Sequence, residues 1–157
     1  MRKIYNVIDT IITVCIISIA LVMVVPLLFN IRSYVVMSSS MEPVFGPGSV
    51  CFIDRKDTQP QEGDIIAYSL SDELITHRVI DIDANGNYIT KGDNNDVPDL
   101  APVTPAQVVG KNVFWIPYFG YFIIWIQTTS GCVIFVTAII AYIIISRLVL
   151  SRKEYWN

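Results

Sequence analysis

Two long apolar runs constrain this chain more than any other feature of its sequence. Residues 10–29 contain no Asp, Glu, Lys or Arg, and residues 131–150 contain only Arg147. A helix that crosses the hydrocarbon core of a bilayer needs about 20 apolar residues, so each run is long enough to span a membrane. The composition agrees, because 53% of the residues are hydrophobic and only 16% are charged, against about a quarter charged in a soluble domain.

Each run also has a second interpretation. The first could be a cleaved secretory signal, but its apolar stretch exceeds the usual length of about 7–15 residues and no small-x-small cleavage site follows it. The second could be a core helix, but a remaining domain of about 100 residues is too small to bury one so apolar. We therefore expect an N-terminal anchor in residues 1–30 and a second transmembrane helix in residues 131–150.

The distribution of basic residues predicts the orientation of both spans. Basic residues flank the runs on the sides nearer the chain ends: Arg2, Lys3, Arg147, Arg152 and Lys153. Under the positive-inside rule both termini are cytoplasmic, including the tail at 151–157. The sequence thus predicts a two-span protein of the cell membrane with residues 31–118 outside the cytoplasm.

The predicted external domain excludes several function classes. Between Asn30 and Tyr118 the chain carries six basic and twelve acidic residues, and no basic patch suggests nucleic-acid binding. The chain has one histidine and three cysteines without a C-x-x-C pair, so neither a metal site nor a disulfide framework is indicated. We expect no cofactor and no metal.

Short β-rich runs separated by turn residues predict a mainly β domain. The runs are Tyr34–Met37, Val50–Ile53, Ile65–Leu70, Leu74–Ile82, Tyr88–Thr90 and Val108–Ile116. Asn85-Gly86 between two of them is a strong hairpin signal. Residues 119–130 begin with a dense group of aromatic side chains, which favours an interfacial segment, although they could instead extend the second span.

Three polar segments of this domain carry side chains that can do chemistry. They are the serines at 38–40, the single histidine at 77, and K-G-D-N-N-D-V-P-D at 91–99. Taken singly they suggest a polar loop, a structural histidine, and a turn or a calcium loop, although the last lacks the ligand spacing of an EF-hand. Together they supply what a serine nucleophile needs, namely a base and a carboxylate that orients it.

The ordered segments resemble the type I signal peptidase family. S-S-S-M-E-P at 38–43, T-H-R-V at 76–79 and the segment at 91–99 are similar to three boxes of that family, in the same order and at the same spacing. Ordinary bacterial members have Lys where this chain has His77. The chain therefore resembles the endoplasmic-reticulum-type branch, which is found in eukaryotes, archaea and sporulating Gram-positive bacteria.

The resemblance implies a role for each matching residue. Ser40 matches the nucleophile, His77 its general base, and Asp99 the acid that orients the base. Ser38 matches a serine that helps to bind the oxyanion, and Asp93 a second carboxylate that supports the loop. Asp93 remains the alternative to Asp99 as the orienting acid.

The resemblance also implies the fold and the reaction. The expected fold is a small β-barrel catalytic domain flanked by two transmembrane helices. The expected reaction is the removal of signal peptides from secretory preproteins at the bilayer surface, with accessory subunits left open. The rival interpretations are a self-cleaving repressor, which would have a DNA-binding segment and no spans, and a non-enzymatic adhesin-like or accessory β domain.

Overall fold

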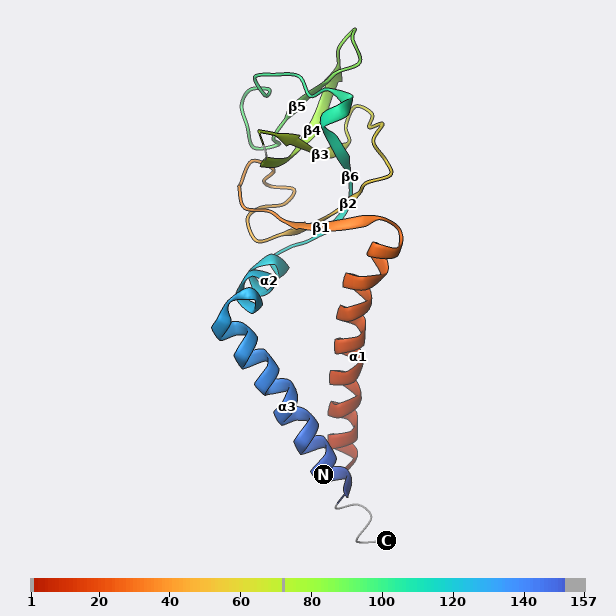
Figure 1. Cartoon of the computed structure of the whole chain (residues 1–157), viewed down its shortest axis with the longest axis vertical. Coiled ribbons are helices and arrows are strands. Elements are labelled where there is room, and N and C mark those ends of the chain that lie inside the picture. The colour runs from red at the N-terminus through yellow and green to blue at the C-terminus, as the bar shows by residue number, and fades with distance from the viewer. Residues whose placement is uncertain (1, 72, 152–157) are drawn as a thin grey trace. The chain divides into compact units, whose positions relative to one another are not determined.

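A computed structural model describes residues 2–71 and 73–151 of the chain. Its elements, in chain order, are α1 (Arg2–Leu28), β1 (Ile31–Val35), β2 (Val50–Asp54), β3 (Ile65–Leu70), β4 (Glu73–Ile82), β5 (Tyr88–Lys91), the 3-10 helix η1 (Pro105–Gln107), β6 (Val108–Ile116), α2 (Phe119–Gln127) and α3 (Thr129–Ser151) (Figure 1). They form two compact units: one holds Met1–Leu21 and Phe122–Asn157, and the other holds Val22–Tyr121.

The six strands form one antiparallel sheet in the order β1-β2-β6-β3-β4-β5. The mainly β prediction is confirmed. The barrel prediction is not, because no ladder joins the edge strands β1 and β5 within residues 2–71 and 73–151. The sheet is open.

Burial on both faces of the sheet explains why an open sheet is stable here. Alternate residues of β3 belong to different core clusters. Ile65 and Ala67 pack with Met41 and Phe45, while Ile66 and Tyr68 pack in a second cluster that includes Val79, Tyr88 and Val103. Successive side chains of a strand point to opposite faces, so loops cover the sheet on both sides and no single barrel interior is needed.

Two turns show how the sequence sets the strand ends. The first strand begins at Ile31 rather than at the predicted Tyr34, because Asn30 takes a left-handed φ of 65° and turns the chain out of α1 at once. The predicted hairpin between β4 and β5 is confirmed. Gly86, at φ 80°, donates its N–H to the Asp83 carbonyl at 2.9 Å, a conformation that glycine adopts without steric cost.

Among the described residues, two helices are apolar and long enough to cross a membrane: Val7–Leu28 within α1 has a mean hydropathy of 3.0, and Thr129–Ser146 within α3 has 2.2. The Tyr142 hydroxyl of α3 donates a hydrogen bond of 2.7 Å to Asp9 Oδ1 of α1. Polar side chains inside spans usually pair in this way.

The aromatic segment at 119–130 contains the helix α2, and α3 begins after it, where Thr128 Oγ1 accepts the Gly131 N–H at 3.0 Å, which caps its first turn. The predicted tail at 151–157 lies, beyond Ser151, outside the described residues. The proposed domain boundaries stay predictions.

The stacked pair of Phe52 and Phe114 offers a test of the core. The ring centroids lie 4.1 Å apart, yet Phe52 is 1% exposed and Phe114 36% exposed. We expect Phe52→Ala to lower the free energy of unfolding by about 3–5 kcal/mol, because it leaves a cavity. Phe114→Ala should lower the free energy of unfolding by less, because water can partly fill the space that the exposed ring leaves. Denaturation of the full chain in detergent measures both, and an equal loss would contradict this packing.

Candidate active site

Ser40, His77 and Asp99 form one continuous chain of hydrogen bonds. His77 Nε2 lies 3.1 Å from Ser40 Oγ, and His77 Nδ1 lies 2.7 Å from Asp99 Oδ2. The three residues are separated by 37 and 22 positions in the sequence, so only the fold brings them together. This arrangement can pass a proton from a hydroxyl to an imidazole whose far side faces a carboxylate.

Ser40 is held by the loop that contains the third sequence motif. Asn94 donates its backbone N–H to the Ser40 carbonyl at 2.8 Å. A Cβ on Gly92 would lie 2.6 Å from the same carbonyl oxygen, so only glycine lets the loop approach this closely. The backbone of the candidate nucleophile is therefore fixed by a segment more than 50 residues further along the chain.

His77 lies in the middle of β4, opposite Ile66 of β3. The ladder to β5 begins at the next residue, Arg78, so His77 stands where one edge of β4 becomes unpaired. Its residue exposure is 8%. The imidazole is shielded from water but still reaches Ser40.

Asp99 receives three side-chain hydrogen bonds on a single oxygen. Besides His77, Thr90 donates its hydroxyl at 2.6 Å and Tyr68 donates at 2.9 Å, all to Oδ2. Partial burial alone would raise the pKa of Asp99, but the hydrogen bonds from His77, Thr90 and Tyr68 outweigh it and hold this pKa below its ordinary value. The carboxylate is thus ionised at neutral pH.

Two consequences follow from the ionised carboxylate. Since it only accepts hydrogen bonds, His77 Nδ1 carries the proton, and Nε2 presents a lone pair to the Ser40 hydroxyl. In addition, because the pKa of Asp99 is lower in the folded chain than in the unfolded one, the carboxylate stabilises the fold above the unfolded-state pKa. That contribution is lost as pH falls through the folded-state pKa.

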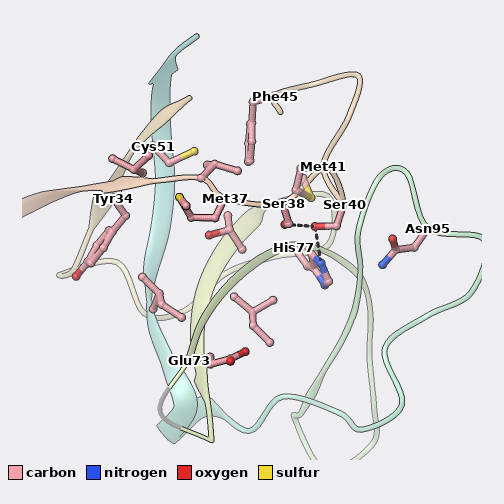
Figure 2. A pocket seen from close by; sticks show the side chains of 15 residues that line it. Tyr34, Met37, Ser38, Ser40, Met41, Phe45, Cys51, Glu73, His77 and Asn95 are labelled. Carbon is pink, nitrogen blue, oxygen red and sulfur yellow. Dashed lines mark hydrogen bonds between the residues drawn. The ribbon is translucent and has the colours of Figure 1, made fainter. Parts of the chain in front are cut away.

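Ser38 lies beside the candidate nucleophile at the end of a groove. Ser38 Oγ is 3.3 Å from Ser40 Oγ. The groove has a volume of about 680 Å³ and is lined by 15 residues of the strand-rich unit. Figure 2 shows the serines and His77 at one end of it, with Asn95 beyond them. A polypeptide segment can therefore lie in the groove with a bond next to Ser40.

Cys51 also lines this groove but is poorly suited to act as a nucleophile. It is 1% exposed, and burial raises the pKa of its thiol to about 12. The reactive form of a cysteine is the thiolate, which is disfavoured here. No group of three or more His, Cys, Asp and Glu side chains that could hold a metal ion occurs in the described part of the chain.

Asp93 lies apart from His77 and pairs with Arg78. The Arg78 guanidinium donates to both carboxylate oxygens, at 2.8 and 2.6 Å, and donates a third bond to the Gly63 carbonyl at 2.8 Å. The hydrogen bonds to Asp93, which outweigh the effect of burial, raise the pKa of Arg78. This fork holds the loop at 92–99 against β4. Asp96 is exposed and makes no ion pair within the described ranges.

The sequence interpretation missed three residues that support the site. Tyr68 and Thr90 hold Asp99, and Arg78 holds Asp93. Arg78 could have been identified from the sequence, because it directly follows the histidine in the second motif. Tyr68 and Thr90 look like ordinary strand residues, and nothing in the sequence distinguishes them.

Comparison with known proteins shows to which family the chain belongs. Residues 30–113, more than half of the chain, match the family model described as Peptidase S24-like. The chain therefore belongs to the Peptidase S24-like family. The matched range contains Ser40, His77 and Asp99.

Individual relatives are named as signal peptidases. The chain is 36% identical over 100 residues to the signal peptidase complex catalytic subunit SEC11 of Candida dubliniensis. This alignment covers 55% of this chain and 60% of that protein. It is 35% identical over 123 residues to signal peptidase I W of Bacillus subtilis, an alignment that covers 69% of this chain and 64% of that protein. It is 34% identical over 107 residues to SEC11 of Zygosaccharomyces rouxii, an alignment that covers 59% of this chain and 64% of that protein. The chain spans about 60–64% of the length of these relatives.

The ion pair between Asp93 and Arg78 predicts that replacement of Asp93 destabilises the fold, whereas replacement of Asp96 does not. We expect Asp93→Asn to lower the free energy of unfolding by about 1–2 kcal/mol, because it weakens two charge-assisted hydrogen bonds in a partly solvated site. Asp96→Asn, three residues along the same loop, is the matched control and should unfold like the unmodified chain. Denaturation of the full chain measures both, and equal stability of the two variants would overturn this role for Asp93.

Proposed function

We propose that this protein is a membrane-bound serine endopeptidase that removes signal peptides from secretory preproteins. The observation that carries the proposal is the hydrogen-bonded chain Ser40–His77–Asp99 at one end of an open groove. The family membership and the names of the relatives support the same reaction class.

In the first half of the reaction Ser40 Oγ attacks the carbonyl carbon of the scissile peptide bond. His77 Nε2 accepts the hydroxyl proton as the new C–O bond forms, and Asp99 stabilises the imidazolium through Nδ1. The tetrahedral intermediate then expels the amine of the mature protein, which takes the proton back from His77. The signal peptide remains as an ester of Ser40.

In the second half water hydrolyses this ester. His77 removes a proton from the attacking water, and the proton returns to Ser40 Oγ when the signal peptide leaves as a carboxylic acid. No redox partner or cofactor is needed, because both steps are acyl transfers.

Ser38 is placed to stabilise the negative charge that develops on the carbonyl oxygen in both halves. Its hydroxyl lies beside Ser40 Oγ, and the Ser40 backbone N–H would be the second donor. Removing one such donor typically costs about 10²–10³ in rate. Ser38 is therefore a contributor to turnover rather than a nucleophile.

The membrane arrangement that we propose suits this substrate. The two apolar helices would anchor the strand-rich unit with both termini in the cytoplasm, as the distribution of Lys and Arg predicts. A signal peptide is itself an apolar helix in the bilayer, and its cleavage site emerges just beyond the hydrocarbon. Ser40 follows Leu28, the last residue of α1, by only 12 positions in the chain, so the nucleophile would stay near the bilayer surface.

The same features argue against the rival functions. A self-cleaving repressor has no use for two helices apolar enough to span a membrane. An accessory β domain has no use for a serine hydroxyl that is hydrogen-bonded to a histidine with an ionised carboxylate behind it. The Candida dubliniensis relative is named as a subunit of a complex and the Bacillus subtilis relative is named as signal peptidase I W, so the proposal concerns the active site of this chain and leaves accessory subunits open.

Replacement of the two adjacent serines tests the nucleophile. Ser40→Ala should abolish cleavage of a signal-peptide substrate, because no other hydroxyl in the described ranges is hydrogen-bonded to His77. Ser39→Ala should keep most of it and is the matched control. The assay uses the purified full chain in detergent with a preprotein substrate. Loss of activity in both variants alike, or in neither, would sink the assignment.

Replacement of Asp99 tests the orienting carboxylate. Asn keeps an oxygen acceptor for Tyr68 and Thr90, so Asp99→Asn should fold. It can hold the imidazole in the wrong tautomer, which in a serine-protease triad costs about 10⁴ in turnover. Turnover numbers for Asp99→Asn and Asp93→Asn, measured beside their melting temperatures, separate the two acids. Normal turnover by Asp99→Asn with a stable but inactive Asp93→Asn would exchange the assignments.

A further inference from the structure

Half of β4 has an unpaired edge that runs up to the candidate active site. β3 pairs with Glu73 through Arg78 on one side of the strand, but β5 pairs on the other side only from Arg78 onward. Within the described residues, the backbone N–H and C=O groups of Glu73–His77 that face away from β3 have no strand partner. Such an edge binds an extended peptide as an added strand.

The groove follows this unpaired edge and ends at a single carboxylate. Its lining includes the apolar side chains of Val36, Leu74 and Ile75. Among the lining residues that the structure describes, Glu73 is the one Asp, Glu, Lys or Arg. Figure 2 shows its carboxylate at the end of the groove away from Ser40 and His77.

Glu73 is free to bind a ligand of opposite charge. Its side chain is exposed, and it forms no ion pair with the described part of the chain. A carboxylate at the end of a largely apolar groove gives that end a negative potential. A cationic side chain is therefore the complementary occupant.

The spacing along β4 says which substrate residue would reach Glu73. The register with β3 is unbroken from Leu70↔Glu73 to Ile66↔His77, so the two residues are about 13 Å apart at the usual strand rise. An extended substrate beside β4 advances at the same rise. The residue near Glu73 thus lies about four or five positions from the scissile bond.

The walls of the groove decide on which side of the bond this residue lies. The apolar wall between His77 and Glu73 suits the signal peptide, whose residues directly before the cleavage site are small. The amide of Asn95 lies at the opposite end and suits the more polar mature chain. The residue near Glu73 accordingly precedes the scissile bond.

We propose that Glu73 makes the peptidase prefer preproteins with Lys or Arg about four or five residues before the cleavage site over those with Asp or Glu there. The inference rests on the proposed function, because it concerns the substrate of that site. An exposed ion pair of this kind changes kcat/KM by about two- to fivefold, so Glu73 is a specificity residue and not a catalytic one.

A charge reversal tests the proposal. The substrates are one preprotein with Lys, Gln or Glu placed in turn at the third to sixth positions before the bond, and a matched set with the same residues after it. The unmodified full chain should cleave the Lys substrate about two- to fivefold faster than the Glu substrate at one or two adjacent positions before the bond. Glu73→Lys should reverse that order, and Glu73→Gln should abolish the preference.

Controls keep this test separate from the test of the proposed function. Glu62→Lys makes the same charge change at an exposed glutamate outside the groove and should leave the preference intact. High salt should weaken the preference, because it screens exposed charges. The inference is overturned if Glu73→Lys and the unmodified chain rank the substrates alike, or if the preference appears only after the bond. Absence of any Ser40-dependent cleavage would instead refute the proposed function.

Discussion

The three hydrogen bonds on Asp99 Oδ2 are the interaction on which the rest of the site depends. The donors come from β3, β4 and β5, so one oxygen joins three neighbouring strands. The bonds keep a partly buried carboxylate ionised, which fixes the proton of His77 on Nδ1 and turns the free lone pair of Nε2 toward Ser40. The same three hydrogen bonds therefore join the strands and set the position of the proton on His77. A substitution of Tyr68 would disturb both.

One loop connects this carboxylate to the nucleophile. Between residues 92 and 99 the backbone of Asn94 holds the Ser40 carbonyl, Asp93 holds Arg78, and Asp99 holds His77. The loop thus fixes the relative positions of a serine that follows β1 and a histidine within β4, two segments with no ladder between them. Close approach at Gly92 makes the connection possible. This explains why carboxylates only a few residues apart serve different purposes.

Under the proposed function, the open edge of β4 would serve to bind the substrate. Unpaired strand edges are usually covered, because they can pair with other chains. Here β5 stops short, loops fill both faces of the sheet, and the uncovered half of β4 forms one wall of the groove. The same opening would admit a substrate strand and leaves Glu73 exposed.

The sequence alone determined the two apolar helices, five of the six strand positions and the hairpin at Asn85-Gly86, because hydropathy, alternation and turn preferences are local properties. It also identified Ser40, His77 and Asp99 as candidates, because the order and spacing of the motifs can be read from the linear sequence. Only the tertiary structure decided that the sheet is open, that Tyr68 and Thr90 share Asp99 with His77, and that Asp93 serves Arg78 instead. These facts depend on strand order and on contacts between distant residues, and the local properties of a strand or a loop do not encode such contacts.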